Sequence, residues 1–166
     1  GIARERSLLG DVAALADFRV DTSSLNVHQL RETVTKYASG RPRTTTVNLM
    51  SFGFRNGAPQ SAELLFDLRF LPNPYWDDQL RGLTGEHPDV AGFVLDSETG
   101  REFFSRLRDF VEYLLPHYDE EGKAYLTIGL GCTGGQHRSV AMAVALAKVL
   151  VEQGREVQLE HRDKPR

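Results

Sequence analysis

The run from Gly131 to Val140 (Gly-Cys-Thr-Gly-Gly-Gln-His-Arg-Ser-Val) combines glycines with a cysteine, a histidine and an arginine. A strand-like apolar stretch precedes it, and a strongly helical stretch follows it. Backbone N–H groups at the start of a helix lack intrahelical partners, and together with the helix dipole they attract an anion. Glycines let the backbone approach that anion closely, and Arg138 can add a bidentate contact. The order of strand, glycine loop and helix therefore predicts a phosphate-binding site.

The same run has a second interpretation. Five residues separate Cys132 from Arg138, which is the C-x5-R spacing of cysteine-dependent phosphatases. Cationic surroundings and a helix N-terminus lower a thiol pKa and favour the nucleophilic thiolate. However, Gly131 stands where the phosphatase signature usually has His, and no obvious loop supplies a general acid. Binding without turnover is therefore the leading interpretation, with no catalytic residue assigned; catalysis by Cys132 and Arg138 is the alternative.

Strand-like and helical segments alternate along the chain. β-branched, period-two patterns predict strands over residues 44–50, 64–71, 124–130 and 155–161, with a short extended run at 18–20. Apolar residues at helical spacing predict helices over 4–16, 25–38 (behind a Ser23-Ser24 cap), 89–95, 98–118 and 140–150, with a short helix-prone piece from Pro59. This alternation predicts an α/β fold: a mainly parallel sheet sandwiched by helices.

Charged side chains follow several of these predicted strands. In a parallel sheet the carboxyl ends of the strands meet at one edge, where ligands bind. That edge would collect Arg55, Arg69 and Arg138. Asp67 would either form a structural ion pair with Arg69 or contact an amine or hydroxyl of a ligand. His137 could contact the ligand, transfer a proton, or be a helix-start residue bonded to the backbone.

Length and composition set the domain organisation. The chain has 166 residues, 40% of them hydrophobic and 26% charged, which is globular composition. The segment Ser-Gly-Arg-Pro-Arg at 39–43 reads as a linker, so we predict a boundary there, between residues 1–40 and 41–166. Cys132 is the single cysteine, so an intrachain disulfide is impossible and a reducing, cytoplasmic setting is expected.

Several classes of partner are disfavoured by the sequence. A net charge of −3 gives no global case for nucleic acid. The apolar run at 140–151 is shorter than the roughly 20 residues that span a bilayer, and no signal peptide is visible. The other histidines show no metal-ligand spacing, so no metal and no cofactor are expected. Tyr75 and Trp76 are expected to be core or interface aromatics. A nucleic-acid patch would have to be local, formed by Lys36, Arg41, Arg43, Arg55, Arg162, Lys164 and Arg166.

Several motifs in order resemble one known family. Ser51–Phe54, Phe66–Pro74, Leu83–Gly85 and Gly131–Val140 look like the C-terminal domain of the RapZ family of bacterial proteins, also described as the RNase adapter or YvcJ-like family. The likeness covers about residues 44–161. Residues 4–30 resemble the end of that family's N-terminal P-loop domain. No Walker A sequence is present, so the nucleotide-hydrolysing core of that domain is expected to be missing from this chain.

The resemblance implies a sensor of a phosphorylated metabolite, an amino-sugar phosphate or a nucleotide sugar. It also implies a homo-oligomer that presents small RNA to a ribonuclease; ATP or GTP would belong to the longer protein, and this fragment is not expected to be an enzyme. The motif match assigns the metabolite site to Asp67, Thr133, Gly134, Gly135, His137, Arg138 and Ser139. The candidate site also includes the neighbouring residues Arg69, Asn73, Cys132 and Gln136. Its rim consists of Arg55, Asn56 and Tyr75.

The sequence departs from the sensor-type members around this pocket. Those members carry His where this chain has Tyr75, a basic residue and His where it has Arg55 and Asn56, and Lys where it has Gln136. The resemblance therefore implies a phosphate site more strongly than a particular sugar or RNA binding.

Overall fold

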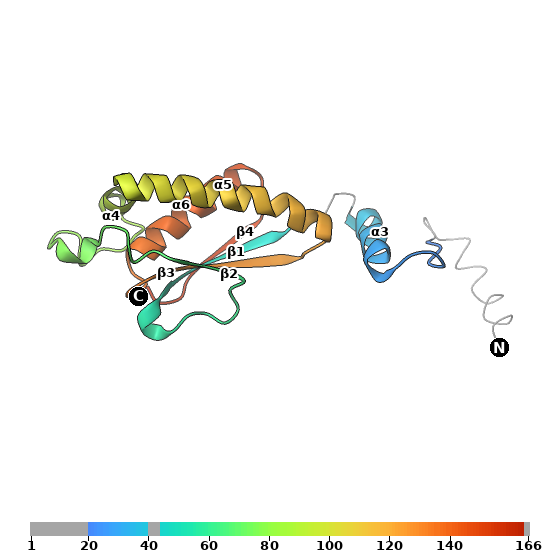
Figure 1. Ribbon diagram of the computed structural model, residues 1–166, viewed down its shortest axis with the longest axis horizontal. Coiled ribbons are helices and arrows are strands. Elements are labelled where there is room, and N and C mark those ends of the chain that lie inside the picture. The colour runs from blue at the N-terminus through green and yellow to red at the C-terminus, as the bar shows by residue number, and fades with distance from the viewer. Residues whose placement is uncertain (1–19, 40–43, 165–166) are drawn as a thin grey trace. The chain divides into compact units, whose positions relative to one another are not determined.

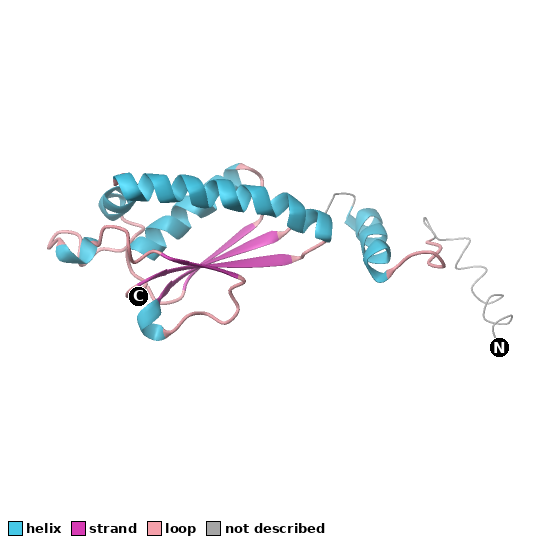
Figure 2. Ribbon diagram, viewed as in Figure 1, coloured by secondary structure: helices cyan, strands magenta, loops and turns pink. Residues whose placement is uncertain are grey.

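Parallel β-strands form the centre of the protein. The computed structural model describes residues 20–39 and 44–164. Strands β1 (Thr46–Gly53), β2 (Leu64–Asp67), β3 (Tyr125–Cys132) and β4 (Val157–His161) pair in the order β2-β3-β1-β4, and every pair is parallel (Figure 2). The predicted α/β fold is confirmed.

Helices cover one face of this sheet. Helices α4 (Pro88–Leu95), α5 (Glu98–Glu121) and α6 (Arg138–Glu152) lie over that face, and residues 54–63, which include the short helix η1 (Phe54–Asn56), lie on the other (Figure 1). Alternate residues of β1 and β3 point toward the helices because side chains of a strand alternate between its two faces. The core between the sheet and the helices includes Val47, Leu49, Leu68, Leu115, Leu126, Ile128, Leu130, Met142, Leu146 and Leu150.

The N-terminal residues form a separate unit. Residues 1–43 and 44–166 are two compact units, and α3 (Val27–Ser39) belongs to the first. Its start is held by Asn26 rather than by the predicted Ser23-Ser24 cap. The Gln29 N–H donates to Asn26 Oδ1 at 2.9 Å, and the Asn26 N–H donates to Gln29 Oε1 at 3.0 Å, which is a reciprocal capping box. The helix predicted over 4–16 lies outside the described residues, and so does most of the extended run at 18–20.

Two elements differ from their predicted forms. Strand β2 ends at Asp67 instead of Leu71, because the Asp67 carboxylate accepts the Arg69 N–H at 3.0 Å and turns the chain. The piece from Pro59 forms a turn, in which the Ala62 N–H donates to the Pro59 carbonyl, rather than a helix. Strands β1 and β3 extend to Gly53 and Cys132, further into the predicted loops, because these two residues are still paired.

Candidate functional site

The carboxyl ends of three adjacent strands meet at one edge. Gly53 is paired with Cys132 at the ends of β1 and β3, and Asp67 is paired with Gly131. The Arg55 N–H donates to the Thr133 carbonyl at 3.2 Å, which joins η1 to the loop that follows β3. The predicted convergence of loops at one edge is therefore present.

The glycine loop, residues 133–137, carries unpaired backbone donors. Within the described part of the chain, the N–H groups of Gly134, Gln136 and His137 have no acceptor, whereas the Gly135 N–H donates to Cys132 Sγ at 3.3 Å. Helix α6 begins directly after this loop with no side-chain cap and no acidic residue in its first turn. The positive end of its dipole is therefore not neutralised.

The glycines of this edge have different roles. A Cβ on Gly53 would lie 2.5 Å from the carbonyl carbon of Gly134, and a Cβ on Gly135 would lie 2.7 Å from the Gly53 nitrogen. Gly135 also has a φ of 79°, which disfavours other residues. A Cβ on Gly134 would meet nothing closer than Arg55 Nη2 at 3.9 Å. Gly53 and Gly135 therefore serve packing, while Gly134 borders free space.

Cys132 is buried beneath the loop. Its Sγ lies 3.1 Å from Ser139 Oγ, and the residue is 3% exposed. Burial raises the pKa of this thiol, but the hydrogen bonds from Ser139 and from the Gly135 N–H, with the nearby charge of Arg138, outweigh burial and hold the pKa below its ordinary value. These contacts therefore favour the thiolate more than solvent does around a free cysteine.

Arg138 connects β2 to the glycine loop. Its Nη1 donates to the carbonyls of Arg69 at 2.8 Å and Leu71 at 3.1 Å, and its Nη2 donates to Thr133 Oγ1 at 3.2 Å. The residue is 4% exposed, and its buried Nε has no partner among the described residues. Three of the five guanidinium N–H donors are thus used within the protein.

Asp67 and Arg69 form the ion pair that the sequence suggested as one alternative. Arg69 Nη2 lies 2.6 Å from Asp67 Oδ2, with both side chains about half exposed. The Arg69 guanidinium also lies over the Phe54 ring, 4.4 Å from its centroid. The Arg69 hydrogen bond holds the pKa of Asp67 below its ordinary value, so this edge presents a carboxylate beside two guanidinium groups.

The side chains of Gln136 and His137 contact a different segment. Gln136 Nε2 donates to the Leu83 carbonyl at 2.9 Å, and His137 Nε2 lies 3.1 Å from the Arg81 carbonyl oxygen. Burial lowers the pKa of His137, although its hydrogen bonds to these carbonyls oppose the shift. Both side chains therefore hold residues 81–83 against the loop.

The predicted residues on the loop after β2 are engaged locally. Asn73 Oδ1 accepts the Tyr75 N–H at 3.4 Å at the start of the short helix η2 (Pro74–Trp76). The Tyr75 ring stacks edge-on against Trp76 and lies under the Arg81 guanidinium. Trp76 is 79% exposed, so the pair is a surface feature and not part of the core.

Sequence reasoning did not include the residues that follow β4 among the site residues. Asp163 accepts the Gly53 N–H at 2.7 Å, and Arg162 donates to the Gly57 carbonyl at 2.7 Å. The predicted strand over 155–161 could have indicated them. If that strand is parallel to the other strands, the residues after it lie at the same edge of the sheet as the other loops. Of the cations considered for nucleic acid, Arg162 is paired with Asp163 and Lys164 with Glu86.

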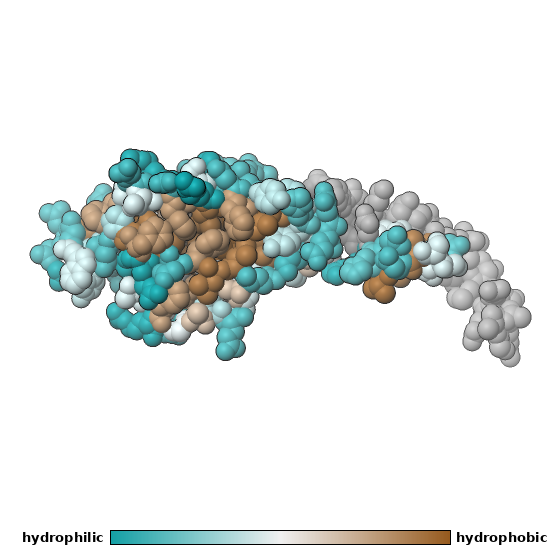
Figure 3. All heavy atoms as spheres, in the orientation of Figure 1, coloured by the Kyte–Doolittle hydropathy of each residue, from teal (hydrophilic) through white to brown (hydrophobic). Residues whose placement is uncertain are grey.

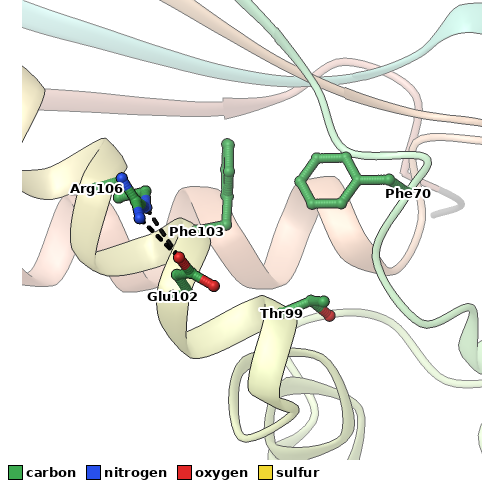
Figure 4. Close-up of a pocket in the computed structure, with 5 residues that line it drawn as sticks. All are labelled: Phe70, Thr99, Glu102, Phe103 and Arg106. Atoms are coloured by element: carbon green, nitrogen blue, oxygen red, sulfur yellow. Dashed lines mark hydrogen bonds and ion pairs between the residues drawn. The ribbon is translucent and has the colours of Figure 1, made fainter.

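An apolar groove lies beside α5, lined by residues outside the glycine loop. Its volume is about 190 Å³, the Glu102–Arg106 ion pair and Phe70 lie on opposite sides of it, and Phe103 lies between them (Figure 4). Apolar side chains also gather on the neighbouring surface (Figure 3). The groove contains none of the predicted site residues.

The described part of the chain offers neither a metal cluster nor a membrane-spanning helix. Residues 20–39 and 44–164 contain no cluster of three or more His, Cys, Asp or Glu side chains that could hold a metal ion. No helix described there has the length and apolarity needed to cross a membrane.

Known proteins match this chain over nearly its whole length. The family described as the RapZ C-terminal domain matches residues 45–165. A protein from Anaeromyxobacter sp. (strain K), named nucleotide-binding protein, is 50% identical over 98% of this chain and 56% of its own length. A protein of the same name from Myxococcus xanthus is 47% identical over 98% of this chain and 57% of its own. The chain thus spans about half the length of these curated relatives.

Proposed function

The chain belongs to the RapZ C-terminal domain family, and from this premise we propose that it is a regulatory domain that binds a phosphorylated metabolite on residues 132–139. The ligand class is an amino-sugar phosphate or a nucleotide sugar. The relatives are named nucleotide-binding proteins, which is our reason for including nucleotide-bearing ligands.

One observation carries this proposal. The N–H groups of Gly134, Gln136 and His137 lack acceptors within the described residues, at the start of a helix whose dipole is not neutralised. Phosphate oxygens are suitable acceptors for such a set of donors. Arg138, whose Nη2 donates to Thr133 Oγ1 of the loop, adds a positive charge beside these donors.

The ion pair beside the loop supports the choice of an amino sugar. Asp67 and Arg69 are each about half exposed, so their contact is weakly held and can be exchanged for contacts to a ligand. In the bound state Arg69 would turn toward the phosphate, and Asp67 would accept a hydrogen bond from an amine or hydroxyl. The low pKa of Asp67 keeps it ionised for that role.

The signalling partner is proposed from the family resemblance. In this scheme ligand occupancy is communicated within a homo-oligomer to a small RNA and a ribonuclease, and ATP or GTP acts on the longer protein. Arg162 and Lys164 are engaged with carboxylates of the domain, so an RNA would have to compete with Asp163 and Glu86 for them.

Gly134→Ala tests the phosphate site with little risk to the fold. An added Cβ meets nothing closer than 3.9 Å, yet it projects into the space that the ligand would occupy. Gly82→Ala is the matched control, because a Cβ there meets nothing within 4 Å. Calorimetric titration of inorganic phosphate, a hexosamine phosphate, a hexose phosphate and a nucleotide sugar should show binding by wild type and Gly82→Ala, and binding about tenfold weaker or lost in Gly134→Ala. Absence of binding to all four compounds, or equal binding by Gly134→Ala, would refute the proposal.

A second function is favoured by one contact. Ser139 Oγ lies 3.1 Å from Cys132 Sγ and stabilises the thiolate, as a phosphatase nucleophile requires. The thiolate would attack phosphorus while the phosphorus–oxygen bond to the leaving group breaks, and the leaving oxygen would take a proton from solvent. Water would then cleave the phosphocysteine, which releases inorganic phosphate and regenerates the thiol. The hydrogen bond from Arg69 lowers the pKa of Asp67 and keeps its carboxylate ionised. Asp67 therefore has no proton to give to that leaving group. Release of phosphate from an aryl phosphate, abolished in Cys132→Ser, would establish this alternative; an intact aryl phosphate would eliminate it.

A further inference from the structure

The chain crosses the candidate site once more after β4. Residues 161–164, which we call the C-terminal strap, leave the sheet at the same edge as the glycine loop, because β4 is parallel to β1. The Arg162 N–H donates to the Ser51 carbonyl at 3.0 Å, which extends the pairing with β1. His161 Nδ1 lies 2.8 Å from Ser51 Oγ. The strap is thus anchored where β1 meets the site.

Asp163 makes the central contacts of the strap. Its Oδ2 accepts the Gly53 N–H at 2.7 Å and pairs with Arg162 Nη2 at 2.6 Å, and its side chain is 11% exposed. Burial raises the pKa of Asp163, but hydrogen bonds from Arg162, Gly53 and Asn56 outweigh burial and hold the pKa below its ordinary value. A largely buried carboxylate that accepts from both the Gly53 N–H and Arg162 is therefore fixed in place.

Gly53 links the Asp163 carboxylate to the glycine loop, because it contacts both. The Gly53 backbone packs so closely on Gly134 and Gly135 that no side chain fits between them. The same added Cβ on Gly135 that would meet the Gly53 nitrogen would lie 2.8 Å from Asp163 Cβ. Gly53 and Asp163 thus pack together against the same side of Gly135, and its position depends on both.

We propose that Asp163 is the positioning residue of the glycine loop. Because it holds the Gly53 amide and packs on Gly135, it keeps the N–H groups of Gly134, Gln136 and His137 in the arrangement that binds an anion. This inference rests on the proposed function for its ligand. Its structural part, the control of Gly53 and Gly135, stands independently of any ligand.

The strap contains its own matched control. Glu86 pairs with Lys164 at 2.6 Å and with His161 at 3.6 Å, so it holds the same segment. It makes no hydrogen bond to Gly53 or to the glycine loop among the described residues. Loss of the Glu86 charge therefore weakens the attachment of the strap without removing the carboxylate that holds Gly53.

The test compares wild type, Asp163→Asn and Glu86→Gln in the full chain. Native-state amide exchange by NMR measures Gly53 and Gly135, with the Thr127 amide, which donates to Glu63, as a distant reference. We expect Gly53 and Gly135 to exchange about tenfold faster in Asp163→Asn, with Thr127 unchanged, because a charge-assisted hydrogen bond is weakened. Calorimetric affinity for inorganic phosphate should fall about tenfold in Asp163→Asn and stay within about twofold of wild type in Glu86→Gln.

The two proposals fail in different ways. If wild type binds no phosphate compound, the proposed function fails, and amide exchange still decides the role of Asp163. Unchanged exchange at Gly53 and Gly135 in Asp163→Asn would overturn that role. So would equal acceleration of Thr127, or an equal effect of Glu86→Gln, since either result would mean general destabilisation instead of positioning.

Discussion

Cys132 Sγ and Ser139 Oγ lie 3.1 Å apart, so the last residue of β3 and the second residue of α6 are joined beneath the glycine loop. Both residues are buried. A hydroxyl donates better to a thiolate than to a thiol, so this contact stabilises the charged sulfur.

Ser139→Ala should therefore raise the pKa of Cys132. A pH titration of the thiolate ultraviolet absorbance measures the shift, with Cys132→Ser as the blank. Because the folded pKa lies below the ordinary 9.0, this group contributes stability that is present above pH 9.0 and is lost as the pH falls through the folded pKa. The variant should flatten this part of the stability profile. An unchanged titration would mean that the contact does not stabilise the thiolate.

His137 should destabilise the fold in acid. Burial holds its pKa below the ordinary 6.5, so its contribution to stability is present above pH 6.5 and is lost as the pH falls through the folded pKa. His137→Gln keeps an N–H donor for the Arg81 carbonyl and cannot ionise. Urea unfolding from neutral to mildly acidic pH should show a shallower loss in this variant. If His137→Gln and wild type lost the same free energy of unfolding as the pH falls, groups other than His137 would be responsible for that loss.

The alternation of strands and helices was readable from the sequence because apolar periodicity records which face of each element is buried. The glycine loop was readable because local composition encodes a turn into a helix. The end of β2 was not readable from the sequence. There the Asp67 carboxylate accepts the Arg69 N–H and turns the chain, and a hydrophobic pattern does not show that such a hydrogen bond replaces strand pairing.

The uses of individual side chains in the site depended on tertiary contacts. Gln136 and His137 contact carbonyls at Leu83 and Arg81, which the sequence places more than 50 positions away. Arg138 contacts carbonyls near the end of β2. Spacing within a motif can predict that a residue belongs to a site, but it cannot say whether the residue supports the loop or faces a ligand.

Gly53→Ala should destabilise the fold, because the added Cβ would lie 2.5 Å from the carbonyl carbon of Gly134 and backbone must move. We expect a loss of about 1–3 kcal/mol in the free energy of unfolding. Gly82→Ala, with open space around its Cβ, should change it by less than about 0.5 kcal/mol. Chemical denaturation measures both. If Gly53→Ala were as stable as Gly82→Ala, the backbone at Gly53 and the glycine loop could move apart at no cost in free energy.

Arg138→Lys should also destabilise the fold, even without ligand. The guanidinium bonds two backbone carbonyls and Thr133 Oγ1 at once, and a lysine ammonium cannot reproduce this planar set of donors. We expect a loss of about 2–3 kcal/mol in the free energy of unfolding. Arg106→Lys is the control, because Arg106 is largely exposed and paired with Glu102 on the surface of α5, where about 0–1 kcal/mol is at stake.

Comparison of Arg138→Lys with Gly134→Ala separates support of the loop from ligand binding at Arg138. If Arg138 supports the loop, Arg138→Lys loses stability whether or not phosphate is present, and Gly134→Ala loses binding without losing stability. If Arg138 served the ligand alone, Arg138→Lys would unfold like wild type in phosphate-free buffer. Its buried contacts to the carbonyls of Arg69 and Leu71 make the first result the expected one, because those acceptors would be left unsatisfied away from water.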